Sequence, residues 1–347
     1  MSRIGVVVIG RNEGERLMRC LASSAGAASA VVYVDSGSSD NSVAHARALN
    51  IDVVELDSAV PFTAARARNE GFRRLMQIAP DTQYVQFIDG DCELIEGWLG
   101  AAGACLDQQP DIAAVCGRLR ERHPEATVYN RLCDMEWNGP VGEIGACGGI
   151  AMMRARAFAE SGGFNPAVIA AEDDELCIRL RQRGGKIWRI GHDMAWHDAA
   201  MTRFGQWWRR ATRAGHAFAQ VNALHGAAPT AYFRREVRSA WLWGLVMPAI
   251  LVTSLVAAWW WAAIGVAALY GFQTVRIWRR TLRRGHRASH AAIYAVNCVI
   301  AKVPHVQGIC RYRWDRLRRR PSRIIEHKQP NSDHQSSGAP GEFVTKH

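Results

Sequence analysis

The first 200 residues alternate between short apolar runs rich in β-branched residues and longer stretches of helical periodicity. The apolar runs are residues 4–9, 31–34, 53–54, 84–88 and 112–115, and the helical stretches are 13–23, 42–48, 64–77 and 94–106. This alternation is typical of α/β proteins, in which helices cover both faces of a sheet. We therefore predict a Rossmann-like, mostly parallel sheet over residues 1–200, with ligands at the carboxyl ends of its strands.

Polar residues follow three of the apolar runs at the point where each run ends. Arg11-Asn12-Glu13 follow the first run, residues 35–40 (DSGSSD) follow the second, and Asp89-Gly90-Asp91 follow the fourth. No G-x-G-x-x-G motif follows any run, which argues against a dinucleotide oxidoreductase. The chain also lacks G-x-x-x-x-G-K-[ST], which argues against a P-loop NTPase.

Asp89 and Asp91 flank a glycine directly after the apolar run 84–88. Two carboxylates held a few ångströms apart repel each other. A divalent cation removes that cost, and carboxylate oxygens suit Mg²⁺ or Mn²⁺. A polar turn after a buried strand is the alternative interpretation, but the neighbouring motifs favour a metal site.

With these neighbours the chain resembles the family 2 glycosyltransferases, which have the GT-A fold. The segments that carry the resemblance are VVVIGRNE (6–13), VDSGSSD (34–40), RNEG (68–71), FIDGD (87–91), GGF (162–164) and EDDELCIRL (172–180). They occur in the order and spacing of the family, over roughly residues 3–200. Many relatives have Asp-Asp-Gly-Ser where this chain has Asp35-Ser36-Gly37-Ser38, but Asp35 keeps its place.

The resemblance implies a UDP- or GDP-linked sugar donor and assigns roles to individual residues. Asp35 would accept a hydrogen bond from the base, and Glu13 would lie near the base and ribose. Asp91 would bind the metal directly, while Asp89 would contact the ribose or a metal-bound water. The other donor-binding residues that the resemblance implies are Arg11, Asn12, Gly37, Ser38 and Arg68. Gly148 and Gly149 precede the apolar run 150–153, where glycines would let the backbone approach the donor sugar. Turn and helix-cap chemistry is the alternative for Asp35 and Glu13, and a simple turn is the alternative for the glycine pair.

An acidic run, Glu172-Asp173-Asp174-Glu175, opens a helical stretch. Acids in a first helical turn are stabilised by the helix dipole, by ~0.3–1 kcal/mol each, which would explain part of the run. The resemblance implies that Asp173 is the general base that takes the proton from the acceptor hydroxyl, a role typically worth ~10²–10⁴-fold in rate. Glu172 is the alternative base, because adjacent carboxylates titrate as a group.

The resemblance extends, with departures, to His197 and to residues 206–210. It implies that His197 is a third metal ligand or a diphosphate contact; a partly buried structural histidine is the alternative. The segment QWWRR (206–210) is similar to the Gln-x-x-Arg-Trp motif of processive members, but Arg210 stands where that motif has Trp. We therefore expect addition of a single sugar. Arg209, Arg210 and Arg213 would neutralise a diphosphate on the donor or on a lipid-linked acceptor, and a basic amphipathic helix at a membrane surface is a compatible interpretation.

Charge is distributed unevenly along the chain. Residues 1–200 contain 20 Lys+Arg and 27 Asp+Glu, a net charge of −7, whereas residues 201–347 contain 23 and 5, a net charge of +18. A strongly basic half favours nucleic acid or an anionic membrane as partner. Nine of the 13 Trp residues and the long apolar runs also lie after residue 200, and Trp favours membrane interfaces, so we predict a membrane and no nucleic acid.

The basic half divides into four predicted segments. Residues 201–240 form basic amphipathic interfacial helices, and 241–275 form an apolar hairpin whose arginine-rich flanks stay on the cytoplasmic side. Residues 288–309 form an interfacial or marginally spanning segment, followed by a basic, anionic-lipid-facing segment at 311–323, which completes a membrane-associated region over 241–326. The polar tail 327–347 is expected to be disordered.

These observations predict a bacterial inner-membrane glycosyltransferase with a cytoplasmic catalytic domain and a Mg²⁺ or Mn²⁺ cofactor. Nine scattered Cys residues without a C-x-x-C pair agree with a reducing compartment. The resemblance implies an inverting transfer to a hydroxyl of a lipid-linked saccharide in exopolysaccharide or envelope glycan synthesis. Two alternatives remain: a metal-dependent nucleotidyltransferase or nucleotide-sugar hydrolase, and a catalytically silent membrane subunit that binds nucleotide.

Overall fold

The computed structural model describes residues 3–26, 28–227 and 232–320, so the predicted tail 327–347 lies outside the described residues. The strands are β1 (Ile4–Gly10), β2 (Ala30–Asp35), β3 (Asp52–Glu55), β4 (Tyr84–Asp89), β5 (Cys92–Leu94), β6 (Ile112–Glu121), β7 (Gly142–Glu143), β8 (Ala151–Arg154) and β9 (Lys186–His197). The helices are α1 (Glu15–Ala25), α2 (Ser42–Ala48), α3 (Ala64–Ile78), α4 (Trp98–Gln108), α5 (Val128–Trp137), α6 (Ala155–Glu160), α7 (Glu172–Gln182), α8 (Phe204–His225), α9 (Arg234–Trp241), α10 (Met247–Val256), α11 (Trp260–Leu282), α12 (Ala288–Ile300) and α13 (Lys302–Leu317).

The strands form one sheet in the order β3-β2-β1-β4-β8-β6-β9-β5, with β7 paired to β9. The prediction of an α/β sheet is confirmed, and the sheet is mixed: β1, β2, β3, β4, β6 and β9 run in one direction, and β5, β7 and β8 run in the other. Strands β1 to β4 pair in parallel, whereas β8 lies antiparallel between β4 and β6, and β5 and β7 both run antiparallel to β9. The sheet is mixed because β8 and β5 enter it from loops rather than from right-handed helical crossovers.

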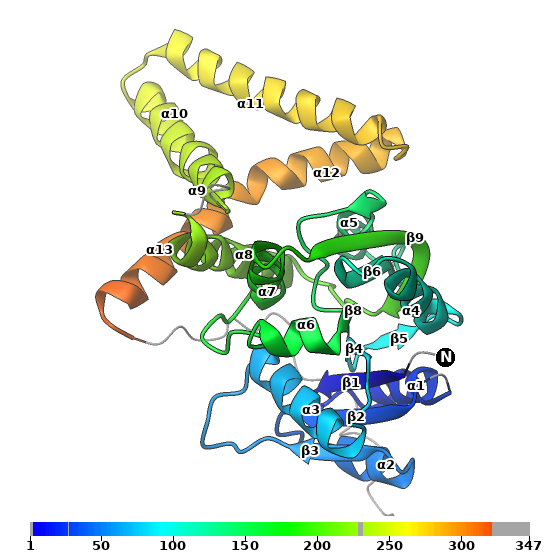
Figure 1. Ribbon diagram of the computed structural model, residues 1–347. Coiled ribbons are helices and arrows are strands. Elements are labelled where there is room, and N and C mark those ends of the chain that lie inside the picture. The colour runs from blue at the N-terminus through cyan, green and yellow to red at the C-terminus, as the bar shows by residue number, and fades with distance from the viewer. Residues whose placement is uncertain (1–2, 27, 228–231, 321–347) are drawn as a thin grey trace, which may run out of the picture.

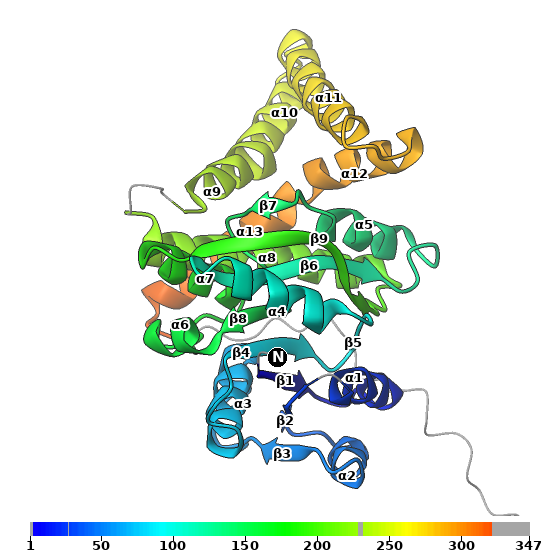
Figure 2. The ribbon, with the colours of Figure 1, turned by 45° about the vertical axis from the view of Figure 1, so that its right-hand side comes forward.

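The first strands are buried on both faces, and helix α3 packs closely against them (Figures 1 and 2). Added Cβ atoms at Gly5 and Gly71 would collide with Leu75 on α3 and with Val7 on β1, respectively. Both glycines therefore let the helix approach the strand, as small residues do where backbones pack closely. This packing places Arg68, one turn before Gly71, beside the carboxyl ends of β1 and β4.

Four helices near the C-terminus lie apart from the sheet. Figure 1 shows α10 and α11 standing away from the α/β body as two arms of a V, with α12 between α11 and the body and α13 packed along α8. Helix α9 continues through a π-helical segment (Leu242–Val246) into α10. Together they give one helix in the described residues, Arg234–Val256, that is long and apolar enough to cross a membrane, and 17% of its most apolar window is buried.

Candidate active site

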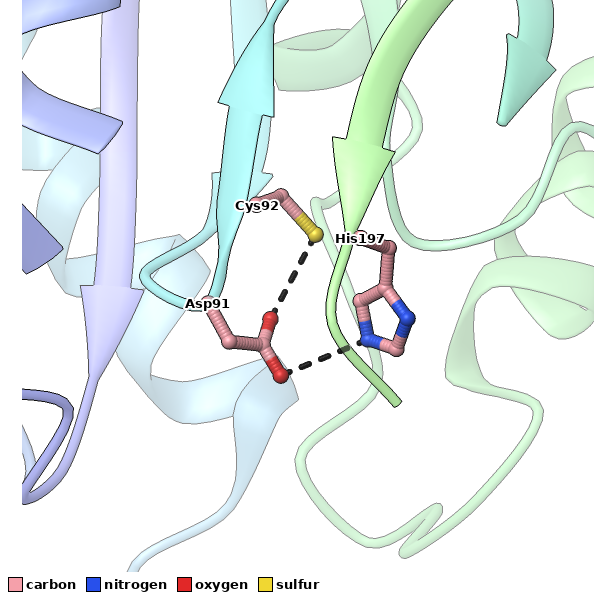
Figure 3. Close-up of side chains that lie close together, drawn as sticks. All are labelled: Asp91, Cys92 and His197. Atoms are coloured by element: carbon pink, nitrogen blue, oxygen red, sulfur yellow. Dashed lines mark hydrogen bonds and ion pairs between the residues drawn. The ribbon is translucent and has the colours of Figure 1, made fainter. Parts of the chain in front are cut away.

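The site begins at the carboxyl end of β4, where the chain turns through Gly90 into β5. Strand β5 pairs antiparallel with β9, and the register sets Cys92 opposite His197. As a result His197 Nε2 lies 3.3 Å from Asp91 Oδ2, and the Cys92 thiol donates a hydrogen bond of 3.4 Å to Asp91 Oδ1 (Figure 3). One ligand atom from each of these three residues lies within 4.8 Å of the others.

Asp91 and His197 fit a divalent cation, whereas Cys92 does not fit Mg²⁺ or Mn²⁺. Burial raises the pKa of the Cys92 thiol well above its usual value, so the thiol stays protonated, and hard cations favour oxygen ligands. Burial lowers the pKa of His197, which keeps its imidazole neutral and able to coordinate. The buried Glu121 carboxylate lies 4.0 Å from His197 Nδ1, on the side away from Asp91, where a carboxylate commonly orients a metal-binding histidine.

Asp89 faces a different partner. Its Oδ1 accepts a 2.8 Å hydrogen bond from Arg68 Nη2, and Arg68 Nη1 donates a 2.7 Å bond to Glu172 Oε1. Arg68 is buried, and an added Cβ at Gly149 would collide with its guanidinium, so Gly149 makes room for it. The structure thus joins the end of β4 to the start of α7 through one arginine.

Asp173 follows Glu172 directly at the amino-terminal end of α7, and it forms no ion pair with any arginine that the structure describes. Burial and the negative charge of Glu172 raise the pKa of Asp173 to about 6. Burial also acts to raise the pKa of Glu172, but the nearby charges of Arg68 and Arg213 outweigh it and leave that pKa lowered. Adjacent acids with opposite shifts are typical of acid–base sites, because one stays ionised while the other exchanges a proton near neutral pH.

The loops after β1 and β2 are bound to each other. Asn12, which has a positive φ of 55°, donates from its N–H to Ser38 Oγ and accepts from the Ser39 N–H at 2.7 Å. Asp35 is buried and accepts four hydrogen bonds, from the Tyr33 hydroxyl, the Gly37 N–H, and the N–H and hydroxyl of Ser38. A carboxylate has about four acceptor positions, so Asp35 is fully used in shaping its own loop.

A cavity of about 850 Å³ connects these parts. The predicted residues that line it are Arg11, Glu13, Arg68, Asp89, Asp91, Gly149, Glu172, Asp173 and Arg210. Those that do not line it are Asn12, Asp35, Gly37, Ser38, Gly148, His197 and Arg209, and the last of these is exposed. Gly148 does not line the cavity but lies next to a residue that does, because an added Cβ at Gly148 would sit 3.8 Å from Asp173 Oδ2.

Sequence reasoning missed several residues at this site. Glu121 lies behind His197, Glu136 pairs with Arg210 at 2.7 Å, and Lys302 lines the cavity from α13. One feature of the sequence could have indicated Glu121: it is an acid at the end of the strand β6. Glu136 and Lys302 carried none, because their approach to the site depends on how α5 and α13 pack.

Comparison with known proteins agrees with this geometry. Residues 5–161 match the family model described as "Glycosyl transferase family 2". None of the curated protein sequences compared matches the chain. The structure is similar to the mannosyltransferase PcManGT from Pyrobaculum calidifontis in complex with GDP-Man and Mn²⁺, with 19% identity, a TM-score of 0.57, and coverage of 90% of this chain and 87% of that one.

Two structures of S. aureus TarS are also similar. The 1–349 fragment has 14% identity and a TM-score of 0.52, with coverage of 88% of this chain and 92% of the fragment. For the longer TarS chain the TM-score is 0.46 at 14% identity; the match covers 65% of this chain but only 40% of that one. The similarities to PcManGT and to the TarS 1–349 fragment support a GT-A-like fold, and residues 5–161, a little under half of the chain, are similar to glycosyltransferase family 2.

Proposed function

We propose that this protein is a metal-dependent, inverting, non-processive glycosyltransferase. It transfers one sugar from a nucleotide-sugar to a hydroxyl of a lipid-linked saccharide in bacterial polysaccharide synthesis. The observation that carries the proposal is the shared cavity, which is lined by the loop residues Arg11 and Glu13, by the carboxylates after β4, and by Asp173. The mannosyltransferase with GDP-Man and Mn²⁺ supports testing GDP-sugars and Mn²⁺ first.

In the proposed reaction Asp173 accepts the proton of the acceptor hydroxyl, whose oxygen forms a bond to the anomeric carbon. The bond from that carbon to the donor phosphate breaks, and the nucleoside diphosphate leaves with the electron pair. Asp91 and His197 would hold the cation, with Asp89 beside them. A bound Mg²⁺ or Mn²⁺ supplies Lewis-acid stabilisation of the leaving diphosphate. Arg68 holds Asp89 and Glu172 in place on either side of the donor sugar.

Binding of nucleotide should be visible as thermal stabilisation. A ligand at about 100 times its Kd stabilises the folded state by about 2.7 kcal/mol, so UDP or GDP should raise the Tm by a few degrees, and more so with Mn²⁺. The measurement is a thermal-shift panel of nucleoside diphosphates with and without metal. No stabilisation by any of them would contradict the donor site.

Transfer itself is tested by following a labelled sugar from the donor that binds. A new glycosidic bond on a lipid extract supports the proposal. Release of free sugar or sugar phosphate alone would instead favour a hydrolase or nucleotidyltransferase. Tight, metal-dependent nucleotide binding without turnover would favour a silent subunit.

We also propose that the C-terminal helices attach the protein to the cytoplasmic face of the inner membrane. The turn between α10 and α11 exposes three consecutive tryptophans, Trp259, Trp260 and Trp261, at 65%, 61% and 87% of their surface. No charged residue occurs between Arg238 and Arg276, so α10 and the part of α11 before Arg276 are free of charged side chains. A water-exposed surface of this kind is typical of a membrane contact.

Replacing the three tryptophans by serine should therefore weaken membrane attachment. Each apolar side chain returned from lipid to water costs roughly 1.5–3 kcal/mol, so the bound fraction should fall by at least about tenfold. The measurement is flotation of the full chain with vesicles of phosphatidylethanolamine and phosphatidylglycerol. Val141→Ser is the matched control, because Val141 is 65% exposed on the α/β body. Equal flotation of the triple variant and the control would refute the attachment surface.

A further inference from the structure

The cavity continues beyond the donor site to the C-terminal helices. At that end it is lined by Arg210 and Arg213 from α8 and by Lys302, the first residue of α13. Helix α12 lies between the α/β body and α11, and α13 packs along α8 at the edge of the body (Figures 1 and 2). One cavity thus reaches from the carboxylates after β4 to the side of the molecule that carries the proposed membrane contact.

The three cationic side chains at this end differ in the hydrogen bonds and ion pairs that they form. Arg210 is ion-paired with Glu136 at 2.7 Å. Arg213 donates one long hydrogen bond, 3.4 Å, to the Ile169 carbonyl. Lys302 is half-buried, and its side-chain ammonium forms no hydrogen bond or ion pair with any described residue.

A partly buried ammonium without a partner is costly in a folded protein. Burial lowers the pKa of Lys302 below its usual value, and Cys298 on α12 and Glu236 on α9 only partly oppose that effect. An anion bound beside Lys302 would provide the missing partner. Arg213 lines the same cavity, and within the described part of the chain its guanidinium forms only the long bond to Ile169, so both side chains are available to an anion in that cavity.

Close helix packing fixes Lys302 in this position. Added Cβ atoms at Gly215 on α8 and Gly308 on α13 would collide with the backbones of the opposite helices, so these glycines let α8 and α13 touch. Gly244 makes the same kind of contact with the Lys302 carbonyl. Three backbone contacts therefore hold the amino-terminal end of α13 against the cavity, which is the rigidity that a binding site requires.

We propose that Lys302 and Arg213 form an acceptor subsite that binds the phosphate or diphosphate of a lipid-linked saccharide. This inference rests on the proposed function, since it names the group that the acceptor presents. The lipid chain would leave the cavity toward α10 and α11, and the saccharide would extend toward Asp173. Lysine and arginine are the side chains that recognise phosphate groups.

The test uses the full chain in detergent with EDTA, so that no metal links a probe to the donor site. The probes are farnesyl diphosphate, inorganic pyrophosphate and farnesol, and their binding is measured by calorimetry. We expect Lys302→Met to weaken farnesyl diphosphate binding by about tenfold or more, because charge-assisted hydrogen bonds are strong, while Lys302→Arg retains most of it. Arg316→Met, which removes one exposed charge from the same helix, should change nothing.

GDP or UDP binding with Mn²⁺ is measured on the same variants. Unchanged nucleotide affinity in Lys302→Met shows that the variant is folded and that the effect belongs to the acceptor end. Nucleotide binding with no effect of Lys302→Met on farnesyl diphosphate would overturn the subsite alone, whereas no nucleotide binding by the unaltered chain would overturn the proposed function. Binding of pyrophosphate as tight as that of farnesyl diphosphate would overturn the lipid part of the proposal, and binding of farnesol alone would overturn the phosphate part.

Discussion

Replacing Asp91 by asparagine is expected to abolish sugar transfer while the protein remains folded. Asp91 Oδ2 lies 3.3 Å from His197 Nε2, and the Asp91 side chain is 3% exposed. Asparagine keeps the shape but removes the charge that would hold a divalent cation. Loss of Lewis-acid stabilisation costs several kcal/mol, which corresponds to a rate reduction of about 10³-fold or more. The measurement is the initial rate of transfer at saturating donor and metal.

Asp81→Asn provides the matched control, because Asp81 is an exposed acid that pairs with Arg3 far from the cavity. Its rate should equal that of the unaltered protein. The circular dichroism spectrum and the Tm of Asp91→Asn without ligand should also stay close to those of the unaltered protein. The further rise in Tm that Mn²⁺ adds to nucleotide binding should disappear. A variant that transfers sugar at the original rate would eliminate the metal role of this residue.

The sequence predicted those strands of the sheet that have a clear local pattern of apolar residues. The runs that became β1 to β4 and the helices between them were visible, because their period and β-branched composition are local properties. The antiparallel strand β8 was not, since Ala151–Arg154 is a short apolar run whose direction is set by its neighbours β4 and β6.

The site divides in the same way. Asp91, Asp89 and Asp173 were found because acids at strand and helix ends are visible in the sequence. The contact of Asp91 with His197 depends on the register of β5 and β9, and the pairing of Arg68 with Glu172 joins residues 104 positions apart. The hydrogen bonds of Asp35 to Gly37 and Ser38 lie within one loop, but their geometry likewise depends on the folded turn after β2.

Asp173→Asn is expected to reduce the rate of transfer by about 10²–10⁴-fold, the usual contribution of a general base. In the unaltered protein a base with a pKa of about 6 must lose its proton to act, so activity should rise with pH and level off above pH 6. Nucleotide affinity should not change, because the residues proposed to bind the nucleotide and the metal, Arg11, Glu13 and Asp91, are left intact. The measurement is kcat and kcat/KM from pH 5 to pH 9, together with nucleotide binding.

Glu172→Gln distinguishes the two candidate bases. The negative charge of Glu172 raises the pKa of Asp173, so removing that charge should lower this pKa and move the acidic limb of the profile to lower pH. Arg68, freed from its 2.7 Å bond to Glu172, would favour the ionised form of Asp173 further. A residual rate with a shifted limb therefore assigns the proton transfer to Asp173. If instead Glu172→Gln were inactive at every pH while Asp173→Asn kept a substantial rate, the base would be Glu172, and Asp173 would only position the acceptor.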